Sequence, residues 1–100
     1  MAQKIIASKV FLKKVTVLNS YLENKWGIST ASEFHEILLH KIIAILKRLS
    51  IGSVSAKKVN VRKIIITKYN RLYYRTNTDK SITLLTLFDN RLNLKKNRYD

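Results

Sequence analysis

Residues 61–76 read VRKIIITKYNRLYYRT, two runs rich in β-branched and aromatic residues on either side of a tight turn. The pattern predicts strands at 61–67 and 72–76. A short turn at 77–80 leads to a third predicted strand at 81–88. Because turns of this length join only antiparallel neighbours, the three strands are expected to form an antiparallel meander.

Two amphipathic helices are predicted before these strands, after a short strand at 3–7. Ser8 is expected to cap the first helix by accepting a hydrogen bond from a free backbone N–H, and Gly27 is expected to end it. Trp26 is expected to pack into the core at the helix end. The apolar stripe of this helix comprises Phe11, Val15, Leu18, Leu22 and Trp26.

The second helix is expected to open with a capping box, in which Thr30 and Glu33 each satisfy the other's backbone N–H. Its apolar positions are Ala31, Phe34, Leu38, Ile42, Ile45 and Leu49, widened by Ile37, Leu39, Ile43 and Leu46. A stripe this wide predicts burial on two sides, by the sheet and by the first helix. Residues 27–29 are expected to join the helices as an antiparallel hairpin.

These elements predict an α+β fold with the order β-α-α-β-β-β. Residues 1–100 are expected to form a single domain with one core. A hydrophobic content of 46% is enough to bury that core and argues against a disordered basic tail. The helical hairpin is expected to cover one face of an antiparallel sheet and to leave the other face open and concave. The last strand is apolar on both faces, which predicts an interior position.

Positive charge is concentrated in the second half of the chain. The whole sequence has a net charge of +14, and residues 51–100 hold 12 basic and 3 acidic side chains, against 8 and 3 in residues 1–50. A field of this strength attracts nucleic acid, anionic lipid or acidic protein. The chain has no Cys, which fits the cytoplasm. The longest apolar run, 42–46, is too short to span a bilayer, so no membrane association is expected.

Metal, cofactor and triad chemistry are not expected. His35 and His40 are five positions apart, so they do not share a helix face as metal ligands would. Gly27 and Gly52 are the only glycines, which leaves no Gly-rich phosphate loop. No Ser or Thr has a suitable His partner, so a hydrolase of triad type is disfavoured.

The remaining candidates for function are cationic and phenolic. They are Arg62, Arg71, Arg75, Arg91 and Arg98, with Tyr69, Tyr73, Tyr74 and Tyr99. Arginine presents a planar fork that suits phosphate or carboxylate, and tyrosine can stack on a base. If Leu72 and Tyr74 face the helices, the alternate positions of that strand line the open face. Those positions are Arg71, Tyr73 and Arg75, and the guanidinium groups are expected to gather over this one surface.

Several segments occur in a characteristic order. They are Lys25-Trp26-Gly27 at the first helix end, Ile51-Gly52, VRKIII at 61–66, NRLYY at 70–74, and the ending FDNR at 88–91. Together they resemble the RelE/ParE family of bacterial type II toxins, across nearly the whole chain. The resemblance implies a cytoplasmic, growth-inhibiting toxin of the plasmid-stabilisation type, held inactive by a cognate antitoxin protein.

One branch of this family, the RelE-like toxins, cleaves messenger RNA in the ribosomal A site. It needs no metal, because cations stabilise the pentacovalent phosphate. For this branch the resemblance implies catalytic roles for Arg62, Arg71, Arg91 and Tyr99. Arg71 matches the phosphate-binding arginine of the third strand, and Arg91 matches the arginine after the last strand. Ile64 stands where the family has a second strand lysine.

The ParE-like branch inhibits DNA gyrase instead, and the Trp26-Gly27 helix end and the ending at 88–91 favour it. For either branch, the residues expected to contact antitoxin or target are Arg62, Arg71, Tyr73, Arg75, Arg91 and Arg98. An amphipathic, acid-containing antitoxin segment is expected to lie across the groove between the helical hairpin and the sheet. A non-toxic basic module that binds RNA or DNA is the third interpretation.

Overall fold

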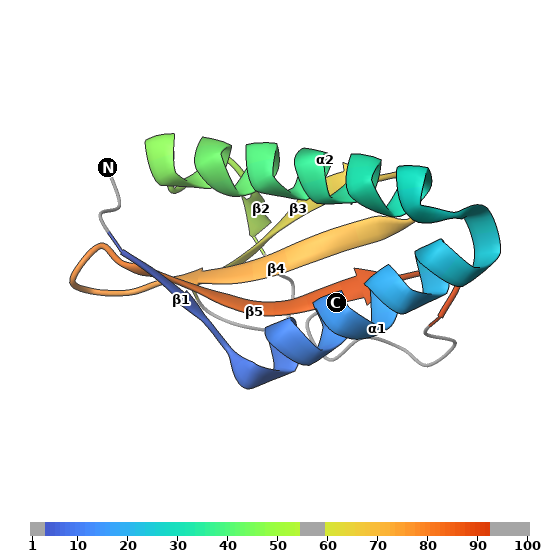
Figure 1. The fold of residues 1–100 in the computed structure, drawn as a ribbon. Coiled ribbons are helices and arrows are strands. Elements are labelled where there is room, and N and C mark those ends of the chain that lie inside the picture. The colour runs from blue at the N-terminus through green and yellow to red at the C-terminus, as the bar shows by residue number, and fades with distance from the viewer. Residues whose placement is uncertain (1–3, 55–59, 93–100) are drawn as a thin grey trace.

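Two helices cover one side of a twisted sheet (Figure 1) in a computed structural model that describes residues 4–54 and 60–92. The elements are β1 (Ile5–Ala7), α1 (Lys9–Trp26), α2 (Ile28–Lys47), β2 (Ser53–Val54), β3 (Val61–Thr67), β4 (Asn70–Thr76) and β5 (Ile82–Asp89). The predicted α+β class and order of elements are confirmed, with the two-residue strand β2 as an addition. No helix in the described ranges has the length and apolar character needed to cross a membrane.

The strands form one sheet in the order β1-β5-β4-β3-β2. The pairs β3–β4 and β4–β5 are antiparallel, which confirms the predicted meander. β2 joins β3 in the antiparallel sense, whereas β1 lies parallel to β5. Two helices rather than a tight turn follow β1, so local sequence does not fix its direction. β5 has a neighbour on each side, which is the interior position predicted from its two apolar faces.

The ends of α1 are set by the residues predicted to set them. The Ser8 side chain accepts a hydrogen bond from the backbone N–H of Phe11 at 3.0 Å. At the other end Gly27 has a φ of 95°, a conformation that favours glycine. Its N–H donates to the carbonyls of Leu22 and Glu23 at 3.1 and 2.9 Å.

The start of α2 differs from the prediction. α2 begins at Ile28, so Gly27 alone joins the helices, and the capping box of Thr30 and Glu33 is wrong. Thr30 already lies inside the first turn, where its hydroxyl donates to the carbonyl of Trp26 at 3.4 Å. The positive φ of Gly27 turns the chain in one residue, which leaves no room for a separate cap.

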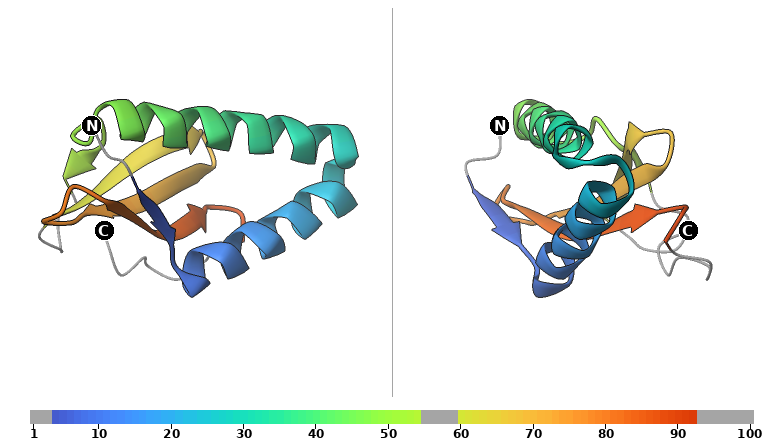
Figure 2. Two further views of the ribbon diagram at one scale, coloured as in Figure 1. Left: turned by 60° about the vertical axis from the view of Figure 1, so that its left-hand side comes forward. Right: turned by 45° about the vertical axis from the view of Figure 1, so that its right-hand side comes forward.

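Both helices pack on the same face of the sheet and diverge from their junction at Gly27 (Figure 2). α2 packs against both α1 and β3, as predicted, but the outer positions Leu39 and Ile43 of its widened stripe are 57% and 39% exposed. Trp26 was expected to pack into the core, but it is 51% exposed, so this prediction is wrong. The core between helices and sheet contains Phe11, Leu18, Leu22, Ala31, Phe34, Leu38, Ile45, Ile66, Leu72, Tyr74, Ile82, Leu84 and Leu87.

A buried tyrosine fastens the segment after α2 to the sheet. The Tyr74 hydroxyl donates to the carbonyl of Leu49 at 2.8 Å and accepts from the backbone N–H of Gly52 at 2.9 Å. Nη1 of Arg62 donates to the carbonyl of Gly52 at 2.8 Å. A Cβ at Gly52 would lie 2.6 Å from the carbonyl oxygen of Lys63 and 2.9 Å from the Tyr74 ring. Only glycine allows this close approach.

Gly52→Ala is therefore expected to destabilise the fold by about 1–3 kcal/mol, because the added methyl group overlaps backbone and a buried ring. The free energy of unfolding in urea measures the effect. Ser53→Ala, at an exposed neighbouring position, is the matched control and should change it by less than about 0.5 kcal/mol. Equal stability of the two variants would contradict the close packing described for Gly52.

Burial raises the pKa of the Tyr74 phenol, against smaller lowering effects of the Gly52 hydrogen bond and the Arg62 charge. The folded state thus favours the protonated phenol. The resulting stability is complete below the unfolded-state pKa of about 10 and is lost as the pH rises through the higher folded-state pKa. In Tyr74→Phe, the free energy of unfolding should fall less steeply as the pH rises above about 10, because the phenol that ionises is absent. An unchanged alkaline profile would exclude Tyr74 as its source.

Candidate functional site

Arg62 lies at the far end of the helix-covered face rather than on an open surface. Its register partner is Tyr74, which belongs to the core beneath the helices. Besides its bond to Gly52, Nη1 of Arg62 approaches the carbonyl of Ser50 at 3.4 Å. Arg62 therefore holds the segment that follows α2.

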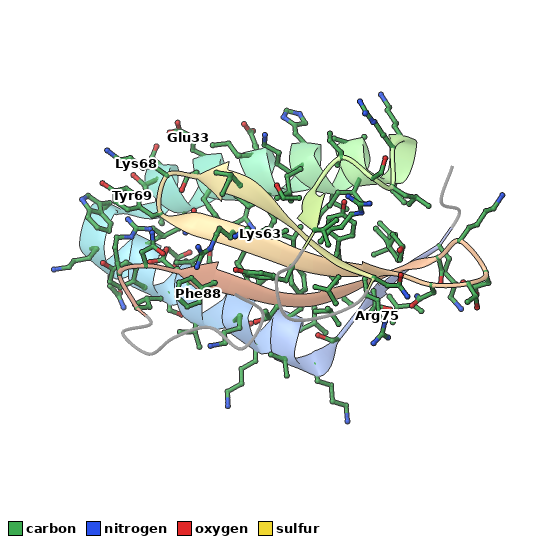
Figure 3. The ribbon with its side chains drawn as sticks, turned by 180° about the vertical axis from the view of Figure 1, so that it is seen from behind. Glu33, Lys63, Lys68, Tyr69, Arg75 and Phe88 are labelled. Carbon is green, nitrogen blue, oxygen red and sulfur yellow. The ribbon has the colours of Figure 1, made fainter. Side chains whose placement is uncertain are left out.

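The face of the sheet turned away from the helices, called the second face below, carries a separate cluster. Arg71, Tyr73 and Arg75 lie on it, as the alternation in β4 predicts. Figure 3 shows Lys63 and Phe88 on the same side, and the sequence analysis missed both. Lys63 pairs with Tyr73, and Phe88 pairs with Arg71. The alternation in the neighbouring strands is the signal that would have found them once the register was known.

Aromatic rings support the cations of the second face. The guanidinium carbon of Arg71 lies 4.7 Å from the Phe88 ring centroid and 5.9 Å from that of Tyr73, within cation–π range. Arg75 is exposed, and its Nε donates to Oδ1 of Asn77 at 3.1 Å. Tyr73 is fully buried, so the expectation that it lines an open surface is wrong. Alternation along a strand fixes the direction of a side chain, and it carries no information about what covers that side chain.

Arg91 lies on the helix side of the sheet, next to the end of α1. Its Nη2 and Nε donate to the Asp89 carboxylate at 2.8 and 3.2 Å, and its backbone N–H donates to the same group at 2.8 Å. Three rings surround the guanidinium carbon, with centroid distances of 4.1 Å for Tyr69, 5.1 Å for Trp26 and 5.4 Å for Tyr21. These contacts fix the plane and position of the guanidinium group.

Asp89 is the centre of a buried polar network. It is 2% exposed, and it accepts a hydrogen bond from Nδ2 of Asn70, its cross-strand partner. Oδ1 of Asn70 accepts from the Thr67 hydroxyl, which in turn accepts from the backbone N–H of Tyr69 at 3.1 Å. Hydrogen bonding to Asp89 raises the pKa of Arg91 above its usual value. The network ties β5 to the β3–β4 turn and, through Arg91, to α1.

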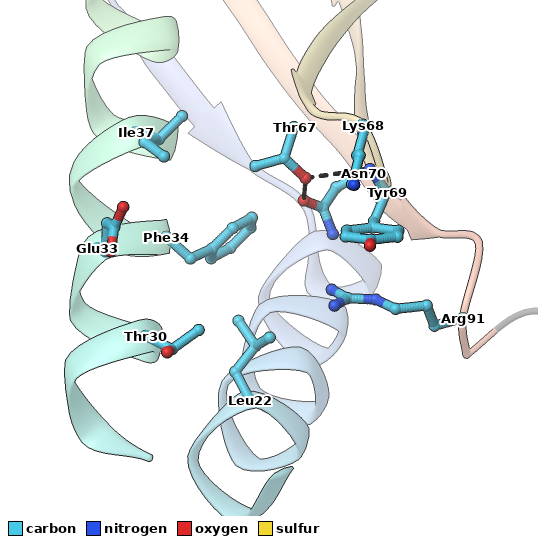
Figure 4. Close-up of a pocket in the computed structure, with 10 residues that line it drawn as sticks. All are labelled: Leu22, Thr30, Glu33, Phe34, Ile37, Thr67, Lys68, Tyr69, Asn70 and Arg91. Atoms are coloured by element: carbon cyan, nitrogen blue, oxygen red, sulfur yellow. Dashed lines mark hydrogen bonds between the residues drawn. The ribbon is translucent and has the colours of Figure 1, made fainter. Parts of the chain in front are cut away.

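A cavity of about 270 Å³ opens beside this network, between α1, α2 and the β3–β4 turn (Figure 4). Leu22, Phe34 and Ile37 point into it from the helices, and Arg91 points into it from the opposite wall. The remaining lining residues are Thr30, Glu33, Thr67, Lys68, Tyr69 and Asn70. The sequence analysis expected a groove between the helical hairpin and the sheet, but it did not identify most of these lining residues, because the walls come from segments far apart in the chain.

The single cationic surface expected from the sequence is thus divided among three places. Arg62 supports the segment after α2, Arg71 and Arg75 lie on the second face, and Arg91 is bound to Asp89 on the helix side. The predicted site residues Arg98 and Tyr99 lie outside the described residues. The pleat explains the division, because Asp89 pairs with Asn70 on the helix face and carries Arg91 to that side.

Arg91→Lys is expected to lower the free energy of unfolding by about 1–3 kcal/mol, because an ammonium group cannot make the two-pronged bond to buried Asp89. Arg75→Lys, at an exposed position, is the matched control and should have an effect within about 0.5 kcal/mol. Urea unfolding followed by the fluorescence of Trp26, the single tryptophan, measures both. Equal stability of the two variants would show that the Asp89 bond is not structural.

No protein-family model matches this sequence, and no curated protein sequence has significant similarity to it. Solved structures do match. A chain of the chromosomal ParDE TA system from P. aeruginosa is similar with a TM-score of 0.72 and 10% identity, over 86% of this chain and 94% of that one. The conserved hypothetical protein HP0892 from Helicobacter pylori is similar with a TM-score of 0.54 and 19% identity, over 91% and 97%. The chain therefore shares the fold of these two structures, in agreement with the fold predicted from the resemblance to the RelE/ParE family.

Proposed function

We propose that this protein is the toxin of a bacterial type II toxin–antitoxin module, acting in the cytoplasm and neutralised by a cognate antitoxin. The observation that carries the proposal is the fold shared with a chain of a ParDE system over 86% of the length. The net charge of +14 supports a function in complex with an acidic partner. Maintenance of a plasmid is a role that fits such a module.

DNA gyrase is the favoured target. The resemblance implies that cleavage of messenger RNA in the RelE manner uses both Arg71 and Arg91. Here Arg71 lies on the second face, while two guanidinium nitrogens of Arg91 are bonded to Asp89 on the helix side. This separation supports growth inhibition through gyrase over cleavage in the ribosome.

Ribosome-dependent cleavage of messenger RNA is the second candidate, and the second face favours it. Lys63, Arg71 and Arg75 lie there with the ring of Phe88. Cations that follow a phosphate backbone, together with a ring on which a base can stack, are typical of surfaces that bind single-stranded RNA. The same cluster would serve a basic module that binds nucleic acid without toxicity.

The antitoxin is expected to bring carboxylates to the cations of the second face and an amphipathic segment to the helix side. Arg75 is exposed, and Lys63 and Arg71 are partly exposed. Neutralisation of these charges should make the complex tight and sensitive to salt.

Expression of the wild-type chain in bacteria should stop growth, and the double variant Arg71→Ala, Arg75→Ala should relieve the arrest at equal soluble yield. The double variant Lys13→Ala, Lys47→Ala removes the same charge from exposed helix positions and should still arrest growth. Supercoiling by gyrase and cleavage of ribosome-bound message, assayed with the same preparations, separate the two targets.

Loss of supercoiling without cleavage is the expected result. Cleavage that depends on Arg71 and Arg91, with supercoiling intact, would replace gyrase by the ribosome as the target. Undisturbed growth at a high soluble yield would contradict the toxin proposal. Binding to nucleic acid with a steep salt dependence would then support the non-toxic module.

A further inference from the structure

We propose that the cavity between α1, α2 and the β3–β4 turn anchors one large aromatic side chain of an acidic protein segment. This inference rests on the proposed function, in which the antitoxin supplies that segment. Charge attraction brings the two proteins together, and the aromatic side chain inserted in the cavity then fixes the position of the partner segment.

The size and the apolar wall of the cavity fit one aromatic side chain. Its volume of about 270 Å³ lies below the range of about 300–1,000 Å³ typical of pockets for small-molecule ligands. A cavity of about 150 Å³ already accommodates benzene, so a phenyl or indole group fits. Leu22 and Phe34 are almost fully buried, and Ile37 is partly buried. Transfer of a ring onto these side chains removes apolar surface from water.

The opposite wall is cationic and aromatic. The Tyr69 ring has the Lys68 ammonium group 5.1 Å from its centroid and the Arg91 guanidinium carbon at 4.1 Å. Nη1 of Arg91 makes no hydrogen bond to any residue that the structure describes, in contrast to Nε and Nη2. A carboxylate next to the inserted ring would meet the Lys68 ammonium group and the remaining Arg91 donor.

Among the lining residues that the structure describes, Glu33 alone is acidic, and it sets a direction for the bound segment. Glu33 is exposed on α2, across the cavity from Lys68 on the β3–β4 turn (Figure 4). A partner carboxylate is attracted toward the turn and repelled from α2. The acidic side of the segment should therefore lie over Lys68 and Tyr69.

Hydrogen bonds and ring contacts hold the polar side of the cavity in place before anything binds. Asn70 is 1% exposed, and its amide is held by Thr67 and Asp89. Arg91 is held by Asp89 and by three rings. A preformed pocket lowers the ordering cost of association. Tryptophan, tyrosine and arginine are also the side chains enriched where binding energy concentrates, and Tyr69 in the cavity wall is exposed.

The test uses the full chain and an acetylated, amidated peptide of the sequence EAFEAE as the probe, followed by amide chemical shifts in nuclear magnetic resonance. The peptide should shift the signals of residues 67–70. A peptide with Ala in place of Phe should bind at least about tenfold more weakly, as expected from the loss of one buried ring. A peptide with Gln in place of Glu should bind more weakly and lose its dependence on salt.

Two variants locate the binding to the cavity. Ile37→Trp fills the cavity and should reduce the affinity for the phenylalanine peptide to that for the alanine peptide. Lys68→Glu reverses the charge of an exposed wall residue and should weaken the acidic peptide but not the Gln peptide. Lys13→Glu makes the same charge change on an exposed position of α1 outside the cavity lining and should leave binding unchanged.

Equal affinity for the Phe and Ala peptides, or shifts confined to residues outside the lining, would overturn the proposal even if Ile37→Trp failed to fold. The result is separable from the proposed function, because growth arrest is measured without any peptide. Peptide binding in the cavity without growth arrest would reject the toxin and keep the anchor site. Growth arrest without peptide binding would keep the toxin proposal and reject the anchor site.

Discussion

The carboxylate of Asp89 is the group on which one end of this molecule depends. An ionised carboxylate taken out of water costs several kcal/mol unless charged and polar partners replace the lost solvent. Asn70 and Arg91 supply these partners to Asp89 from the adjacent strand and from the residue that follows β5. Each partner is consequently fixed in position. The β3–β4 turn, the end of β5 and the end of α1 meet around this one group.

The same constraint changes the role of the arginine beside it. A surface arginine is free to follow a phosphate or a carboxylate ligand, but Arg91 has two of its nitrogens bonded to Asp89 and its guanidinium group enclosed by Tyr21, Trp26 and Tyr69. Arg91 therefore has a fixed position in the wall of the cavity and does not move to follow a ligand. Among the described arginines predicted as site residues, Arg71 and Arg75 on the second face remain accessible to a large polyanion, and Arg75 is the more exposed of the two.

At the opposite end of the sheet, backbone carbonyls rather than a carboxylate accept the hydrogen bonds of the side chains. The Tyr74 hydroxyl and the Arg62 guanidinium group hold the backbone at Leu49 and Gly52, where the chain passes close to β3. The helices thus connect to the sheet at both ends. Between these fixed ends, the outer sides of the helices retain apolar side chains such as Leu39 and Ile43, each more than one third exposed. A rigid frame with unpaired apolar and cationic surface is what a protein that functions in a complex requires.

Periodicity and turn length were enough to predict the meander, the two helices, the cap at Ser8 and the break at Gly27, because each depends on neighbours within a few residues. The same local reasoning placed Arg71 and Arg75 correctly on the face away from the helices. It failed for the start of α2, where one glycine replaced a capping box, and for Trp26, which is half exposed instead of packed in the core.

The sequence by itself determined the class of fold and the sign of the charge, since composition and alternation are properties of the chain. Only the tertiary structure decided that Arg62 and Arg91 serve the frame, that Lys63 and Phe88 join Arg71, and that a cavity forms beside Asn70. The physical reason is register. Whether two side chains separated by twenty or more residues meet depends on how the strands are aligned and on which helix covers them, and no local pattern contains that information.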